Sequence, residues 1–265
     1  MNPDGQKKKL ILTGAGGRMG RAISRRFLDD GIVEYVGAVD PVAVGQNAGV
    51  LSGAGSEGPV IVNSVDELPA DLNADYLLDF SIAEATRKTV EPCLRRGWDY
   101  IIGATGLAEE DYMWLSKLSR YNERRVVIVP NFTLGVNLML RILKDACKVY
   151  KNAEIIELHH DKKIDAPSGT AIHTSHLISQ NMKPDIPPGA KDESRGKFVE
   201  NIPVHAIRLP GLLAHQEVIF GGPGEVFTIR HDTTDRDAFL NGIYLAIENL
   251  EKLEPGLTVG LDWVF

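Results

Sequence analysis

The sequence Gly14-Ala-Gly-Gly-Arg-Met-Gly20 directly follows the short apolar segment Lys9–Thr13. After it, residues 18–29 space their apolar side chains along one face of a predicted helix. A glycine-rich turn between a strand and a helix lets the backbone approach a pyrophosphate closely, and the helix N-terminus offers free N–H groups to the phosphates. The segment therefore predicts a strand–turn–helix unit that binds a dinucleotide.

Asp40 supports this prediction, because it ends the second predicted strand, Tyr35–Val39. An acidic side chain at that place can accept hydrogen bonds from the adenosine ribose of NAD, and it would repel the 2′-phosphate of NADP. The next residues, Pro41–Val44, include no basic group, although Arg18 and Arg21 lie in the glycine turn and the helix after it. We therefore expect NADH to be preferred by about 10-fold, or about 1.4 kcal/mol, with NADPH possible.

Up to about residue 130, short apolar runs alternate with longer amphipathic stretches. This alternation predicts an α/β fold in which a Rossmann-like dinucleotide-binding domain contains a mostly parallel sheet. After Pro130, consecutive predicted strands joined by turns indicate a second, α+β domain with a mixed or antiparallel sheet. We expect the first domain to span residues 1–132 and to be completed by 237–265, and the second to span 133–236.

The composition excludes several classes of protein. The chain has 265 residues, of which 43% are hydrophobic and 25% charged, as in an ordinary globular protein. Its formal net charge of −7 argues against a nucleic-acid partner. Cys93 and Cys147 form neither a disulfide framework nor a zinc motif. Because no apolar run approaches the length of a membrane span, we expect a cytoplasmic protein with no membrane partner.

The run Glu157-Leu-His-His-Asp-Lys-Lys-Ile-Asp-Ala-Pro-Ser-Gly-Thr-Ala171 concentrates the chemistry of the second half. His159 and His160 end a strand predicted over Ala153–His160, so they point to opposite sides and have different roles. Adjacent histidines are also poor ligands for one ion, so we expect no metal. Ser168-Gly-Thr170 precedes a predicted helix and can bind a carboxylate, while Lys163 adds a positive charge or a proton. Histidine supplies acid–base chemistry near neutral pH.

Three further segments follow predicted strands of the first domain: Asp79–Ser81, Gly103–Gly106 and Pro130–Thr133. Ligands of open parallel sheets lie outside the carboxyl ends of the strands. We therefore expect these segments to line the nicotinamide half of the nucleotide site.

The central run resembles the signature of the 4-hydroxy-tetrahydrodipicolinate reductase (dihydrodipicolinate reductase) family. Three other segments of the chain also resemble segments of that family: Gly14–Gly20, Gly103–Gly106 and Asn131-Phe-Thr-Leu-Gly-Val-Asn137. The resemblance covers nearly the whole chain, and the central run is its most specific part. One departure is Ala104, where many members carry threonine, which puts a side-chain contact at that position in doubt.

The resemblance implies specific roles for these residues. His159 matches a proton donor or acceptor and Lys163 a proton donor. Substrate-binding positions are matched by His160, Ser168, Gly169 and Thr170. Nucleotide-binding positions are matched by Gly14, Ala15, Gly16, Gly17, Arg18, Met19, Asp40, Gly103, Ala104, Thr105, Val129, Pro130, Asn131 and Phe132.

The resemblance also implies a function. We expect NAD(P)H-dependent reduction of 4-hydroxy-tetrahydrodipicolinate, a cyclic dicarboxylate, to tetrahydrodipicolinate in lysine and diaminopimelate biosynthesis, by a homotetramer whose second domain supplies the assembly surface. Two alternatives stay open: a reductase of another small dicarboxylate, because fold does not fix function, and a non-catalytic nicotinamide-nucleotide sensor. A sensor has no need of Lys163 beside an anion-binding turn.

Overall fold

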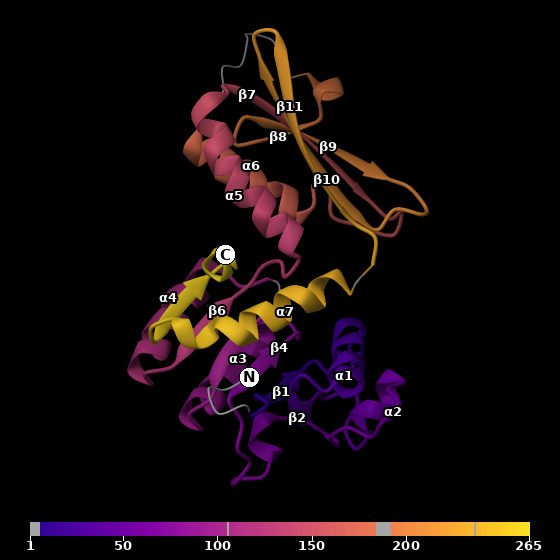
Figure 1. Ribbon diagram of the computed structural model, residues 1–265, viewed down its shortest axis with the longest axis vertical. Coiled ribbons are helices and arrows are strands. Elements are labelled where there is room, and N and C mark those ends of the chain that lie inside the picture. The colour runs from indigo at the N-terminus through magenta and orange to yellow at the C-terminus, as the bar shows by residue number, and fades with distance from the viewer. Residues whose placement is uncertain (1–5, 105, 184–191, 236) are drawn as a thin grey trace. The chain divides into compact units, whose positions relative to one another are not determined.

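The computed structural model describes residues 6–104, 106–183, 192–235 and 237–265 (Figure 1). The chain divides into two compact units. Unit 1 comprises Met1–Pro130 and Ile243–Phe265, and unit 2 comprises Asn131–Gly242. Within the described residues, every helix is too short or too polar to cross a bilayer.

Unit 1 is built on a seven-stranded sheet in which every neighbouring pair is parallel. Its strand order is β12 (Gly256–Val259), β6 (Arg125–Ile128), β5 (Asp99–Ile102), β4 (Tyr76–Asp79), β1 (Lys9–Thr13), β2 (Glu34–Val39) and β3 (Ile61–Val62). The central strands are continuous apolar runs, and Leu10, Ile11 and Leu12 of β1 are all fully buried. Such runs form where both faces of a sheet are covered by helices.

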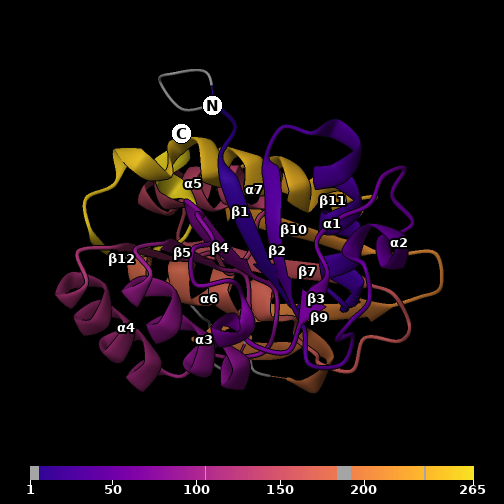
Figure 2. The ribbon, with the colours of Figure 1, turned by 90° about the horizontal axis from the view of Figure 1, so that it is seen from below.

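Helices cover both faces of this sheet. Figure 2 shows α3 (Ala83–Arg95) and α4 (Glu109–Tyr121) on one face and α7 (Ala238–Asn249) on the other. The ring of Phe27, in α1 (Arg18–Asp30), packs against Tyr244 of α7 with centroids 5.8 Å apart. The remaining helices are α2 (Ala48–Ser52), η1 (Val65–Glu67), η3 (Leu250–Lys252) and η4 (Asp262–Val264).

The strand order places a switch point at the centre of the sheet. From β1 the chain moves outward to β2 and β3, and it then returns to β4 on the other side of β1. In open parallel sheets, ligands bind outside the carboxyl ends of the strands at such a switch point. The glycine turn begins at this edge.

Unit 2 contains a mixed five-stranded sheet. Its order is β11 (Glu225–Thr233), β10 (Ala214–Gly222), β7 (Asn152–His159), β9 (Ile202–Arg208) and β8 (Lys197–Val199). Only β7 and β9 pair in parallel. Two helices, α5 (Leu134–Val149) and α6 (Gly169–Asn181), pack together beside the sheet (Figure 1). The short helix η2 spans Glu193–Arg195.

The predicted fold class is confirmed: a Rossmann-like parallel sheet is joined to an α+β unit with a mixed sheet. Two strands were not predicted, β8 and β12, because each has three or four residues and gains its conformation from pairing with a neighbour. The strand predicted to reach His160 ends at His159, and a turn follows it.

Candidate active site

Two glycines of the turn, Gly14 and Gly20, are packed so tightly that no side chain would fit in their place. Gly14 has φ +76°, and a Cβ atom there would lie 2.6 Å from the carbonyl oxygen of Phe80. A Cβ on Gly20 would lie 1.9 Å from the Gly14 carbonyl oxygen. Only glycine tolerates a positive φ together with such close backbone approach. These glycines bring the start of α1 against the ends of β1 and β4.

The N-terminus of α1 has its backbone donors available for an anion. Its N-cap is Gly17, which offers no side chain, and the first turn contains no acidic residue. The first N–H groups of a helix have no partner within the helix, and the helix dipole gives them a partial positive charge. Arg18 is exposed at the first helical position, and Ala15 is buried beneath the turn. The residues present therefore fit a pyrophosphate.

Asp40 has a contact that the sequence did not reveal. Its carboxylate is mostly buried and accepts hydrogen bonds from the backbone N–H groups of Gly16, at 2.9 Å, and Val42, at 2.8 Å. A carboxylate has about four acceptor sites, so these two bonds leave capacity for ribose hydroxyls. Asp40 therefore fixes the glycine turn, which is a structural role beyond the ribose contact predicted for it.

A second buried carboxylate ties the strand ends of unit 1 together. Asp79, at the end of β4, is fully buried and accepts hydrogen bonds from the side chains of Thr13, Thr86 and Tyr100, each at 2.7 Å. The backbone N–H and the hydroxyl of Ser81 also donate to it, at 2.9 and 2.5 Å. The carboxylate thus joins β1, β4, β5 and α3 at the edge where the nucleotide is expected.

The other predicted nucleotide contacts follow neighbouring strands. Gly103 and Ala104 follow β5, and Val129 and Pro130 follow β6 in unit 1. Thr105 lies outside the described residues.

Asn131 and Phe132 begin unit 2. The Asn131 side chain accepts from the N–H of Thr133 at 2.8 Å, and Asn137 donates to the Asn131 carbonyl at 2.8 Å. The backbone after β6 is therefore held by side chains at the start of α5.

In unit 2, the end of β7 presents His159 beside a buried carboxylate. The Nδ1 atom of His159 lies 2.5 Å from Oε2 of Glu157. His160 follows the strand and its carbonyl accepts from the N–H of Lys163 at 3.1 Å, which forms the turn. The Lys163 ammonium donates to both carboxylate oxygens of Asp165 at 2.8 Å, and this ion pair lowers the pKa of Asp165.

The helix start predicted as an anion site is present. Ser168 is the N-cap of α6, is almost fully buried, and accepts from the N–H of Ala171 at 3.2 Å. Its hydroxyl oxygen is therefore used in capping. Gly169 is exposed and Thr170 half-buried in the same turn, so these two residues present the accessible surface of the helix start.

Sequence reasoning missed the ion pair beneath this turn. The guanidinium of Arg208 donates to both carboxylate oxygens of Glu157 at 2.7 Å, and the backbone N–H of Ser168 donates to Glu157 at 3.0 Å. Burial raises the pKa of Glu157, but the hydrogen bonds from His159 and Arg208 outweigh it and hold the pKa at about 2. The sequence pattern could have indicated this ion pair. Glu157 continues the alternate positions Ala153 and Ile155, whose side chains are buried, and a buried carboxylate needs a cationic partner.

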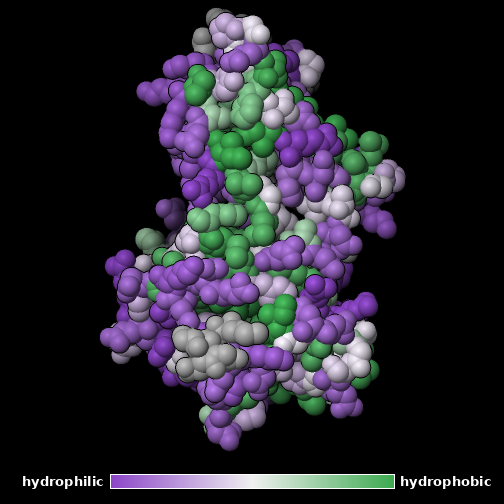
Figure 3. All heavy atoms as spheres, in the orientation of Figure 1, coloured by the Kyte–Doolittle hydropathy of each residue, from purple (hydrophilic) through white to green (hydrophobic). Residues whose placement is uncertain are grey.

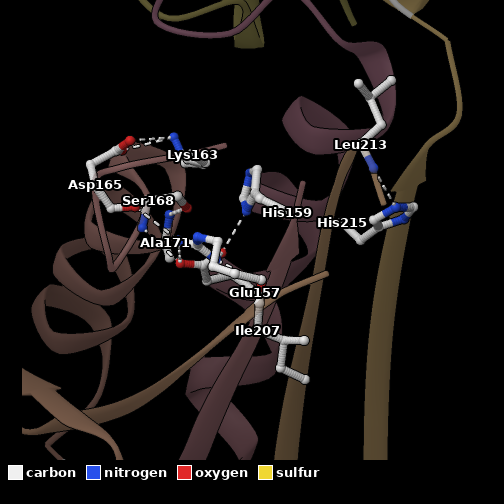
Figure 4. A network of polar contacts seen from close by, with 10 residues as sticks. Glu157, His159, Lys163, Asp165, Ser168, Ala171, Ile207, Leu213 and His215 are labelled. Atoms are coloured by element: carbon white, nitrogen blue, oxygen red, sulfur yellow. Dashed lines mark hydrogen bonds and ion pairs between the residues drawn. The ribbon is translucent and has the colours of Figure 1, made fainter. Parts of the chain in front are cut away.

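Figure 4 shows this cluster, with Glu157 between the end of β7, the start of α6 and β9. His215 lies on the neighbouring strand β10. Its Nε2 accepts from the N–H of Leu213 at 3.2 Å, and its Nδ1 lies 2.7 Å from an Asp232 oxygen. The cluster therefore contains an acid–base side chain, a lysine and a helix N-terminus, which together suit a carboxylate-bearing substrate.

A Rossmann-type domain joined to a domain with such a cluster is the architecture of an NAD(P)-dependent oxidoreductase. Family models described as "Dihydrodipicolinate reductase, N-terminus" and "Dihydrodipicolinate reductase, C-terminus" match residues 8–132 and 135–265. The chain belongs to the dihydrodipicolinate reductase family, and the resemblance found in the sequence is confirmed.

Relatives and solved structures agree with this membership. The 4-hydroxy-tetrahydrodipicolinate reductase of Moorella thermoacetica is 40% identical over 258 residues, which cover 96% of each chain. That of Dictyoglomus turgidum is 38% identical with the same coverage. A dipicolinate-bound dihydrodipicolinate reductase from Paenisporosarcina sp. TG-14 has a TM-score of 0.85 and 29% identity, and the match covers 98% of this chain and 100% of that chain. The WlbA dehydrogenase of Thermus thermophilus, solved with NAD, shares the fold at a TM-score of 0.58 and 16% identity over 97% of this chain and 91% of that chain.

Proposed function

We propose that the chain reduces 4-hydroxy-tetrahydrodipicolinate to tetrahydrodipicolinate with NAD(P)H, within lysine and diaminopimelate biosynthesis. The reaction balances as substrate, NAD(P)H and a proton giving tetrahydrodipicolinate, NAD(P)⁺ and water. The observation that carries the proposal is the joining of His159 and the start of α6 through one buried carboxylate, Glu157, in a member of this family.

Residues 1–132 and 237–265 form the nucleotide-binding domain in this proposal. The bound nicotinamide nucleotide supplies the hydride. Its pyrophosphate would meet the start of α1, whose N-cap carries no side chain. The residues that would hold the nucleotide are Gly14, Ala15, Gly16, Gly17, Arg18, Met19, Asp40, Gly103, Ala104, Thr105, Val129, Pro130, Asn131 and Phe132.

Residues 133–236 form the substrate-binding domain. His160, Ser168, Gly169 and Thr170 bind the dicarboxylate, because a helix N-terminus stabilises a negative charge. Lys163 contributes a positive charge that Asp165 partly balances, and the ammonium hydrogen that is not bonded to Asp165 is the proton that it donates as the ring is reduced. His159 exchanges a proton with the substrate through Nε2, since Nδ1 is held by the Glu157 carboxylate.

NADH is the preferred cofactor in this proposal. The Asp40 carboxylate accepts a hydrogen bond from Gly16 of the glycine turn, and the residues after it, Pro41–Val44, contain no cation to pair with a 2′-phosphate. A modest preference of about 10-fold leaves NADPH usable.

We further infer a homotetramer that works in the cytoplasm, where reduced nicotinamide nucleotides are available to a biosynthetic reductase. Unit 2 has exposed apolar side chains on both faces of β11, because Val226 and Phe227, which point to opposite faces, are 69% and 37% exposed. Apolar side chains also gather over α5 in Figure 3, where Leu138 is 47% exposed. Apolar patches of this kind mark contact surfaces between proteins. Light scattering tests the tetramer directly.

The test of the reaction is oxidation of NADH in the presence of the condensation product of pyruvate and aspartate semialdehyde. We expect substrate-dependent loss of absorbance from a folded, NADH-binding preparation. Titration with pyridine-2,6-dicarboxylate, a planar mimic of the substrate, separates the alternatives. A reductase of another small dicarboxylate or a nucleotide sensor would bind NADH but neither oxidise it with this product nor bind the mimic.

A further inference from the structure

The Glu157–Arg208 pair joins each part of the site in unit 2. Glu157 contacts His159 at the end of β7 and the N–H of Ser168 at the start of α6. Arg208 also donates to the backbone carbonyl of Asp165 at 2.8 Å, in the turn that carries Lys163. One ion pair therefore anchors the strand end, the turn and the helix start.

We propose that Glu157 and Arg208 are positioning residues that fix the tautomer of His159 and hold the substrate-binding turn in place. The proposal rests on the proposed role of His159 as the residue that exchanges a proton with the substrate. Neither Glu157 nor Arg208 was assigned a role from the sequence, and neither needs to touch the substrate.

The tautomer follows from the hydrogen-bonding capacity of the carboxylate. With its pKa held at about 2, Glu157 is an anion near neutral pH and can only accept hydrogen bonds. His159 must therefore carry its hydrogen on Nδ1, which leaves Nε2 to exchange the proton. A buried carboxylate also stabilises the imidazolium when the ring is protonated, as the aspartate does in Ser-His-Asp triads.

The contacts of Arg208 distinguish positioning from substrate binding. Its Nη1 donates to Glu157 and to the Ile207 carbonyl, and its Nη2 donates to Glu157 and to the Asp165 carbonyl. Each terminal nitrogen has two hydrogens, so all four are used. Its Nε is buried and has no hydrogen-bond partner among the described residues. The guanidinium is therefore committed to the protein, and its terminal nitrogens are not available to a substrate carboxylate.

Replacing Glu157 with glutamine should change the tautomer of the His159 ring. The Oε1 position of Glu157 receives donors from Arg208 and Ser168, and neither can become an acceptor. The Oε2 position faces Arg208 and His159, and of these partners only the imidazole can change from donor to acceptor. The new amide NH₂ should therefore turn toward His159 and force its hydrogen onto Nε2.

The chain contains a matched control on the same strand. Glu154 also pairs with an arginine and a histidine, because it contacts Arg195 and lies 2.8 Å from Nε2 of His205. The side chains of these three residues are partly exposed, and among the described residues they form no side-chain hydrogen bond with the segment 157–171. Glu154→Gln therefore removes a similar Glu–Arg–His interaction without disturbing the proposed site.

The experiment combines the pH profile of kcat with ¹⁵N NMR of the histidine rings in the full chain. We expect Glu157→Gln to lower kcat by about 10³-fold, to move the pH limbs of the profile, and to shift the His159 signals from the Nδ1–H to the Nε2–H form. The KM for NADH should be unchanged. Glu154→Gln should leave kcat, its pH profile and the His159 signals as in the wild type.

Two outcomes would overturn the proposal. One is a pH profile of unchanged shape that is merely scaled down in Glu157→Gln, which would indicate a structural role. The other is an Nε2–H tautomer of His159 in the wild type, a measurement that does not need the variant to fold.

Arg208→Lys gives a second, independent check, because it keeps a positive charge but loses the two-pronged contact. We expect the wild-type tautomer together with a raised KM for the substrate. An unchanged KM would refute the role of Arg208 in holding the turn. If the wild type does not reduce the substrate at all, the proposed function fails, while the NMR result still decides whether Glu157 fixes His159.

Discussion

Replacing Asp40 with asparagine should bring catalysis with NADPH close to catalysis with NADH. At about 5 Å and an effective dielectric constant of about 20, two unit charges repel by about 3 kcal/mol. Salt and the exposed Arg18 screen part of this repulsion, which leaves about 1.4 kcal/mol, or a 10-fold preference for NADH in the wild type. Asparagine removes the charge and keeps one of the two oxygens, so it can still accept from one of the two backbone donors, the N–H of Gly16 on Oδ2 or the N–H of Val42 on Oδ1.

The assay is kcat/KM for both nucleotides with the wild type, Asp40→Asn and Asp40→Ala. Alanine removes the hydrogen bonds to the glycine turn as well as the charge, so it should weaken both nucleotides while also changing their ratio. A wild type that prefers NADPH, or the same ratio of kcat/KM values in all three proteins, would show that Asp40 does not select the cofactor.

Three further predictions concern the two buried carboxylate clusters and the lysine. Asp79→Asn should weaken NADH binding by about 10-fold in a fluorescence titration, because it loosens the strand ends. The control is Asp99→Asn at the opposite end of the sheet, where Asp99 accepts from the N–H of Arg125 at 2.8 Å; it should lower Tm without changing the affinity for NADH. Equal NADH affinities in the two variants would contradict this prediction. Lys163→Ala should lower kcat by about 10²-fold or more, whereas a loss confined to KM would make Lys163 a binding group only. The pKa of Glu157 is lowered from 4.5 to about 2, so its ionised carboxylate stabilises the folded state by about 3 kcal/mol. This contribution is complete above about pH 5 and is lost as the pH falls toward 2. The free energies of unfolding of the wild type and Glu157→Gln, measured in urea, should therefore converge over that range, and a constant difference would exclude this linkage.

The parallel unit was predictable because its signals are local. The apolar strands around Leu10 to Leu12 and the glycine turn depend on residues near one another in the chain. Strand β12 was missed because its four residues become a strand only by pairing with β6, more than a hundred residues earlier.

The candidate site was only partly predictable, because some of its contacts join residues that are far apart in the chain. The run from Glu157 to Ala171 supplied the residue types, and their spacing indicated an anion site and an acid–base group. The partner of Glu157 is Arg208, 51 positions away, and the parallel pairing of β7 with β9 brings it there. Asp40 was assigned to the nucleotide edge, but its hydrogen bond to Gly16 depends on the fold of the turn.

The most direct test of the central claim follows the hydride itself. NADH carrying deuterium at both C4 positions is incubated with the protein and the condensation product of pyruvate and aspartate semialdehyde, and the product is analysed by mass spectrometry. We predict tetrahydrodipicolinate that contains one deuterium and that forms much more slowly with Lys163→Ala. Product without deuterium, or no product from a protein that binds NADH, would contradict it.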